Sequence, residues 1–184
     1  PECDAQDQIY GGRFFSDYRL ADNRRLIASE REWNLRRDAD LTDFWPREEL
    51  PHSYMTHHAN FALPKQGYTH WWKLFLSRQL LVHANLMRAV VEGSDNNDVR
   101  NQVLGGIIQC LNFLNLFVTF NVQRDHNNQL FANNNYRPKD TTVEVSPFGR
   151  FGNGNFFSVR DNVNEGLIWA RDPWETASPN LRAE

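Results

Sequence analysis

The sequence contains only two cysteines, Cys3 and Cys110, among its 184 residues. Small secreted domains held by disulfide frameworks need several cysteine pairs, so the chain does not belong to that class. A single bridge between the two is not expected either, because Cys3 lies in a polar N-terminal stretch and Cys110 in an apolar one. The sequence also has no Asn-x-Ser/Thr sequon, which argues mildly against a glycosylated secreted protein.

Positive charge is not in excess. The formal net charge is -3 at pH 7 and the sequence pI is about 6.1. A chain of this charge lacks the basic field with which nucleic-acid-binding domains attract phosphates, so we expect no nucleic-acid partner. Charge of both signs is dense between residues 13 and 41, where acids alternate with arginines. This interleaving is typical of a solvated helix face with salt bridges, and it predicts a helix over 23–37.

No nucleotide-binding, phosphate-binding or nucleophile motif occurs in the sequence. We therefore assign no catalytic residue and no cofactor-binding residue from sequence alone.

Two long apolar segments, residues 71–93 and 99–123, are present and are joined by Ser-Asp-Asn-Asn-Asp at 94–98. Each segment is far longer than the roughly 4–8 residues of a buried strand, so both are predicted to be helices. The acidic and amide-rich joint suits the start of a second helix. The sequence thus predicts a mainly α fold (α+β), with an antiparallel helical hairpin over 71–123 at the centre of a small helical bundle.

The second apolar segment carries no charged residue between 101 and 123. Read as a helix, it places uncharged polar side chains on one stripe: Asn101, Asn112, Asn115 and Thr119, with Gln102 and Gln109 at the edge. A solvated helix face normally carries lysine, arginine or glutamate. The stripe therefore predicts packing against protein, within a bundle or an oligomer. A membrane span is the disfavoured alternative, since amides are costly in hydrocarbon unless partners satisfy them.

Histidines gather before and within the first of these helices. His52, His57, His58 and His70 lie in the proline- and aromatic-containing stretch 42–70, which is predicted to be a long irregular loop. His83 interrupts the apolar face of the first helix one turn after Gln79, and the two are predicted to hydrogen-bond to each other in the core. The alternative is a zinc-like site formed by side chains that converge on one metal: His57, His58, His70 and His83. Their spacing matches no recognised metal motif.

The remaining residues, 124–184, are expected to form a surface loop, a small β-hairpin or meander, and an extended tail. Short β-prone runs at 141–146, 155–160 and 166–171, separated by turn residues, are the basis for the strands. Taken as one domain, the chain then divides into a flexible tail (1–12), a charged helical segment (13–41), the loop (42–70), the hairpin (71–123) and the C-terminal part (124–184).

Two functional hypotheses follow from these patterns. The first is a non-enzymatic interaction or assembly subunit that packs through the uncharged helix and the aromatic loop, with a protein partner or a second copy of itself. The alternative is a metal-dependent enzyme, a hydrolase, that uses His57, His58, His70 and His83. The first is favoured because no complete catalytic set is present.

Overall fold

The computed structural model describes residues 19–53, 56–57, 62–124, 126–130, 142–149, 153–178 and 181–183. Its described part is mainly helical with small antiparallel strand pairs, which confirms the predicted fold class. The helices are α1 (Leu20–Arg36), α2 (Ser77–Gly93), α3 (Asn97–Leu111) and α4 (Phe156–Arg171). Single 3-10 turns occupy Leu63–Gln66 and Trp71–Leu74. The strands are β1 (Thr119–Asn121), β2 (His126–Asn128), β3 (Glu175–Ser178) and β4 (Leu181–Ala183).

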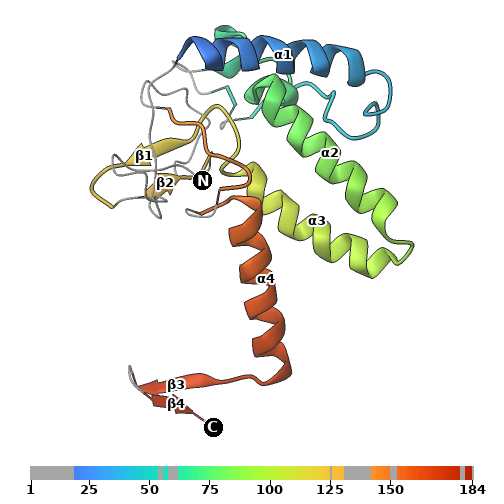
Figure 1. The fold of residues 1–184 in the computed structure, drawn as a ribbon. Coiled ribbons are helices and arrows are strands. Elements are labelled where there is room, and N and C mark those ends of the chain that lie inside the picture. The colour runs from blue at the N-terminus through green and yellow to red at the C-terminus, as the bar shows by residue number, and fades with distance from the viewer. Residues whose placement is uncertain are drawn as a thin grey trace, which may run out of the picture.

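Helix α1 confirms the helix expected over 23–37 and lies across the start of α2 (Figure 1). At its N-terminus the backbone N–H of Arg19 donates to Asp22 at 2.9 Å, which satisfies one of the free amides of the first turn. Asp40, just after the helix, accepts from Arg36 at 2.5 Å and from Arg88 of α2 at 2.7 Å. The Arg36 guanidinium holds the pKa of the Asp40 carboxyl below its usual range. This ion-paired group ties α1 to α2.

The core between α1 and α2 is built on aromatic and aliphatic side chains. Its buried members are Trp33, Leu41, Leu80 and Ala84. The Trp45 ring meets Trp33 edge-on with centroids 5.3 Å apart, and its indole N–H donates to the Arg37 carbonyl at 2.8 Å. Aromatic side chains of the described part of the 42–70 loop thus pack inward, where edge-to-face contacts add to the burial of apolar area. A second cluster lies further along the chain: Leu50, Leu63, Leu74 and Phe117.

The predicted hairpin is present as α2 and α3, but it is shorter at both ends than 71–123. Residues 71–74 form a 3-10 turn, and α2 begins only at Ser77. The joint is as expected: Asn96 accepts hydrogen bonds from the backbone N–H groups of Asp98 at 2.9 Å and Val99 at 3.3 Å. These bonds satisfy two of the four free amides at the start of α3.

The largest error in the predicted hairpin is the end of its second helix, which stops at Leu111 instead of Gln123. The cause is Asn115. Its side-chain amide donates to the Leu111 carbonyl at 2.7 Å, the acceptor that the Asn115 backbone N–H would use in a continuing helix. Its side-chain oxygen accepts from the Phe117 N–H at 2.8 Å. The side chain therefore replaces the helical hydrogen bond and turns the backbone.

The predicted strands at 155–160 and 166–171 are wrong, because both runs belong to α4. Asn155 starts this helix: its side chain accepts from the Ser158 N–H at 2.9 Å, and the Ser158 hydroxyl donates to the Asn155 carbonyl at 2.9 Å. A side-chain cap outweighs the β preference of Phe, Val and Ile. The observed strand pairs lie elsewhere, with β1 on β2 and β3 on β4, both antiparallel. Of the run 141–146, Thr142 makes only an isolated bridge to Thr119.

Prediction on the core. Leu80→Ala and Leu114→Ala are each expected to lower the free energy of unfolding by about 2–5 kcal/mol, because both side chains are buried and a cavity remains. Urea denaturation midpoints measure the effect. The matched control is Leu20→Ala at the start of α1, where the side chain is 70% exposed and a change within about 0.5 kcal/mol is expected. Equal midpoints for all three variants would contradict this description of the core.

Candidate functional site

His83 lies in the interior with 6% of its surface exposed. Its Nε2–H donates a hydrogen bond to the Leu114 carbonyl at 3.0 Å. In the neutral ring this leaves Nδ1 without a proton. Nδ1 is buried and has no hydrogen-bond partner within the described part of the chain. Burial lowers the pKa of His83, since the charged ring would lose its hydration there.

The predicted hydrogen bond between Gln79 and His83 does not form. Gln79 is buried as expected, but its side-chain oxygen accepts from the Leu76 N–H at 2.9 Å and so caps the start of α2. The first turn of the helix supplies a free amide that competes for the carbonyl of Gln79. His83 instead bonds to Leu114 and so connects α2 to the segment that follows α3.

The loop histidines have partners of their own. The His57 and His52 rings stack with centroids 4.1 Å apart, and His57 Nδ1 lies 2.8 Å from the Thr56 hydroxyl. His70 Nδ1 lies 2.8 Å from the Thr69 hydroxyl. His58 falls outside the described residues.

A metal centre gains no support from this arrangement. Among the residues that the structure places, no group of three or more His, Cys, Asp or Glu side chains could hold a metal ion. His57, His70 and His83 each bond to a different neighbour. The four-histidine site, which includes His58, stays a prediction.

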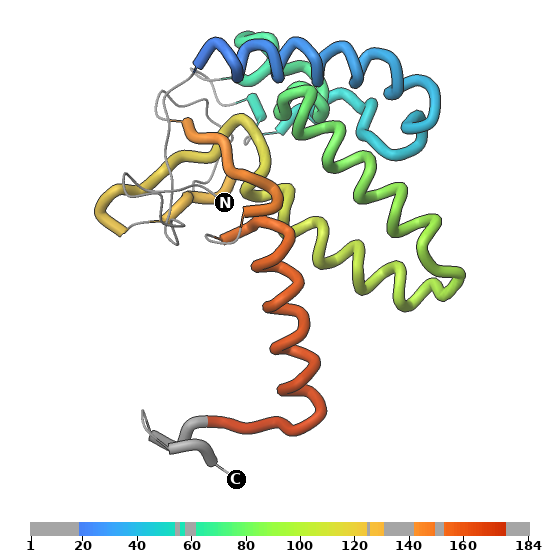
Figure 2. Tube along the Cα trace, viewed as in Figure 1, coloured from blue at the N-terminus to red at the C-terminus, as the bar shows by residue number. Residues whose placement is uncertain are grey.

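Helix α4 differs from α1, α2 and α3 in its burial. None of its sixteen residues, all of which are described, is buried. It leads away from the remainder of the described chain (Figure 2). Its exposed large apolar side chains are Val163, Leu167, Ile168 and Trp169. Burial against the body therefore contributes little to the stability of this helix.

The N-terminal end of α4 is firmly positioned. Gly154 has a φ of 78°, a conformation that glycine adopts without strain. A Cβ at this position would lie only 2.1 Å from the Phe113 ring, so the turn and the ring are in direct contact. Beyond this turn, α4 crosses α3 at Gly106. A methyl group there would reach Val159 at 3.5 Å and Val163 at 3.7 Å, which is ordinary van der Waals distance.

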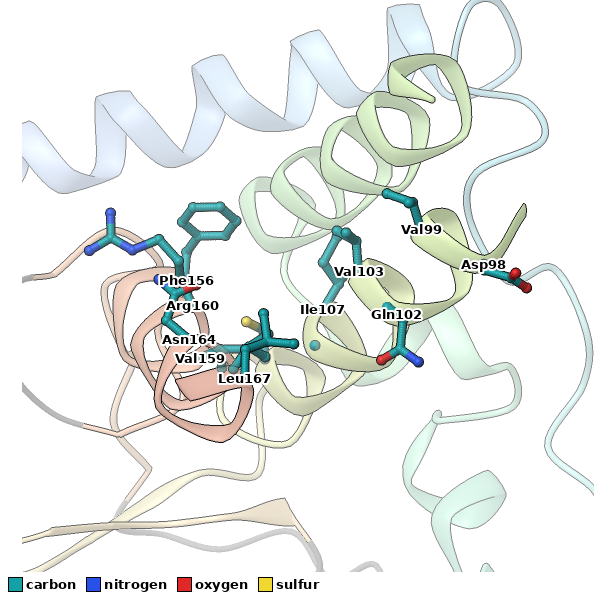
Figure 3. A pocket seen from close by; sticks show the side chains of 13 residues that line it. Asp98, Val99, Gln102, Val103, Ile107, Phe156, Val159, Arg160, Asn164 and Leu167 are labelled. Atoms are coloured by element: carbon teal, nitrogen blue, oxygen red, sulfur yellow. The ribbon is translucent and has the colours of Figure 1, made fainter. Parts of the chain in front are cut away.

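An apolar groove lies between α3 and α4 (Figure 3). Its volume is about 390 Å³. Apolar side chains dominate its walls: Val99, Val103 and Ile107 from α3, and Phe156, Val159, Val163 and Leu167 from α4. The spacing of the α4 residues is i, i+3, i+7 and i+11, which places them on one helix face. An open apolar groove of this kind is typical of a surface that binds another helix.

A second hollow adjoins the same two helices. It has a volume of about 660 Å³ and is lined by amide side chains, glycine backbone and the Phe113 ring. Its amides include Gln102, Gln109, Asn153 and Asn162. Two of these, Gln102 and Gln109, belong to the predicted uncharged stripe. They are exposed in α3, whereas Asn115 and Thr119 of the same stripe are buried within the chain itself.

No protein-family model, curated protein or solved structure matches this chain. The site must therefore be interpreted from its own geometry. None of the described helices combines the length and apolarity that crossing a membrane requires.

Helix α4, and hence the groove, was not predicted from the sequence. A signal was present: Phe156, Val159, Val163 and Leu167 repeat with helical spacing, and Asn155 precedes them with Ser158 three residues on. Both features indicate a helix N-terminus followed by an amphipathic face. The β-prone residue types in the same run concealed them.

Prediction on Asn115. Asn115→Lys is expected to lower the free energy of unfolding by several kcal/mol, because it removes two hydrogen bonds and places an unpaired ammonium at a site that is 1% exposed. Asn101→Lys, the same substitution at an exposed position of α3, is the control and should change little. Thermal or urea unfolding compares them. A stable Asn115→Lys protein would show that this amide does not set the end of α3.

Prediction on pH. The stability contributed by His83 should be complete above pH 6.5, its ordinary pKa. Below that pH the unfolded chain takes up a proton that the buried ring does not. The free energy of unfolding should therefore fall until the pH reaches the lowered folded-state pKa. Urea unfolding between pH 8 and pH 5 measures the decline, and His83→Gln should make it shallower. The difference in the free energy of unfolding between the two proteins at pH 8 gives the cost of the substitution itself, and it is subtracted at each lower pH. Parallel curves would contradict the buried neutral ring.

Proposed function

We propose that this chain is a non-enzymatic interaction subunit that binds a protein partner through the apolar groove between α3 and α4. Two observations on α4 carry the proposal. The helix has no buried residue, and its apolar face lines an open groove. Large contiguous apolar surface is costly to expose to water, and where a protein presents it, a binding role is the usual explanation.

The shape of the groove favours a helical partner. Its two walls are helices of 15 and 16 residues, which correspond to about 22–24 Å of length. A third helix can lie between such walls and contact both with one amphipathic face. Each large aliphatic side chain that becomes fully buried contributes about 1.5–3 kcal/mol, so a few anchors supply the affinity of an ordinary complex.

The uncharged part of α3 is consistent with this role. Between Asn101 and Leu111 the helix has no charged residue, so a partner packed against this part desolvates amides; the charged residues that line the groove are Asp98 and Arg160. Amides can re-form hydrogen bonds across an interface, whereas an unpaired buried charge costs several kcal/mol. This composition supports an interface more readily than it supports a face that remains in water.

Prediction on the groove. A photo-crosslinking amino acid placed at Val103 is expected to yield a discrete adduct in cells that express the chain, because that side chain lines the groove and is partly exposed. Mass spectrometry of the adduct identifies the partner. The control is the same amino acid at Val122, in the turn after β1, where the side chain is 81% exposed and lies outside the groove. Equal labelling at both positions would overturn the proposal.

A further inference from the structure

Helices α3 and α4 cross at Gly106. The C-terminal end of α3 lies near the N-terminal end of α4, and the helices diverge from there at a wide angle (Figure 1). Near the crossing each helix covers the other. Away from it, the N-terminal half of α3 leaves Val99 and Val103 exposed, and the C-terminal half of α4 leaves Leu167 exposed. Val163, at the edge of the covered part, is also 45% exposed. One chain therefore carries two bare apolar half-helices, one on each wall of the groove.

We infer that the occupant of the groove is a second copy of this chain, related to the first by a two-fold axis; this inference rests on the proposed function. The bare half of α3 in one copy then packs on the bare half of α4 in the other. The same rotation brings the remaining two halves together, because a two-fold interface pairs each patch with its counterpart twice.

The apolar spacing on the two halves is matched. Val99 and Val103 are four residues apart on α3, as are Val163 and Leu167 on α4. Each pair presents one short ridge with i, i+4 spacing, which suits ridge-into-groove packing between antiparallel helices. The intermolecular contact would thus continue the pattern of the crossing within one chain, where Val159 and Val163 lie against the Gly106 backbone.

Charge at the outer ends of the two helices gives an independent reason for a second copy. Asp98 is in the first turn of α3, and Arg171 is in the last turn of α4, directly before the exposed Asp172. Neither side chain forms an ion pair within the described residues, and both are exposed. Antiparallel pairing of α3 with the α4 of a second copy brings these two ends together twice in the dimer.

Two helices of about 22–24 Å from each copy would form a four-helix assembly. A net charge of -3 per chain is too small to oppose association at physiological ionic strength.

Sedimentation equilibrium of the full chain over a wide concentration range tests the inference. The parent protein should be a dimer that dissociates on dilution. Leu167→Glu should weaken association at least about 100-fold, since it places a carboxylate among apolar side chains. Ile168→Glu is the matched control: the neighbouring residue is exposed and does not line the groove, so its dissociation constant should stay within about threefold. Circular dichroism of both variants verifies that the helices persist.

The charge pair is tested by exchange. Asp98→Arg alone and Arg171→Asp alone should each weaken association about tenfold, because each replaces two attractive contacts with two repulsive ones. The double variant Asp98→Arg/Arg171→Asp should return to within about threefold of the parent protein. A parent protein that is monomeric up to millimolar concentration, or a double variant weaker than both single variants, would overturn the inference.

The inference and the proposed function can fail separately. A monomeric parent protein with a Val103 adduct to one different protein would reject the second copy and retain the interaction role. A dimeric parent protein whose Val103 adduct has twice the mass of the chain supports both. A monomeric parent protein without a specific adduct at Val103 rejects both.

Discussion

The bend at residues 112–119 is the constraint on which the other elements depend. It is one of the most buried stretches of the described chain, with Leu114, Asn115 and Val118 almost fully enclosed. Buried backbone groups must find hydrogen-bond partners, and several of those in the bend find them on elements that are distant in sequence. The Leu116 N–H donates to the Leu74 carbonyl at 2.9 Å, and the Val118 carbonyl accepts from Val143 at 2.9 Å.

These bonds explain why the surrounding elements meet where they do. The Asn112 carbonyl accepts from the Leu130 N–H at 2.8 Å, which brings the end of the β1–β2 pair onto the end of α3. The His83 ring attaches α2 to the same bend through Leu114. Phe113 supports the Gly154 turn from which α4 starts. A straight helix to Gln123 would satisfy its own backbone and offer none of these attachment points.

The parts of the fold that were predictable from sequence are those set by local chemistry. The joint between α2 and α3 is an example, because Asn96 caps the helix that follows it. Helix α1 was predictable from interleaved charge. The end of α3 was not, since hydrophobic periodicity continues past Leu111, where shorter-range backbone bonds and the side chain of Asn115 replace the helical pattern. Helix α4 was missed because β-branched and aromatic residues were given more weight than the Asn155 cap.

The sequence predicted a packing surface on the uncharged second helix, but it did not locate the groove between α3 and α4. Packing through uncharged α3 remains the basis of the proposed function, but the groove needs α4, which sequence reasoning had assigned to strands. The four-histidine site stays a prediction, because His58 lies outside the described residues. Among the described histidines, His57 contacts Thr56, His70 contacts Thr69 and His83 contacts Leu114. No sequence pattern fixes the path of the loop that carries the first two.

Because α4 has no buried residue, it is expected to unfold locally while the core helices stay folded. Segments with few buried contacts unfold locally at a small fraction of the global free energy, while core helices open only with the whole fold. The amides of α4 are therefore expected to exchange with solvent hydrogen through local opening, and those of α2 through global unfolding. For the same reason a protease is expected to cut α4 before it cuts α2. A bound partner that covers the helix would slow both processes together.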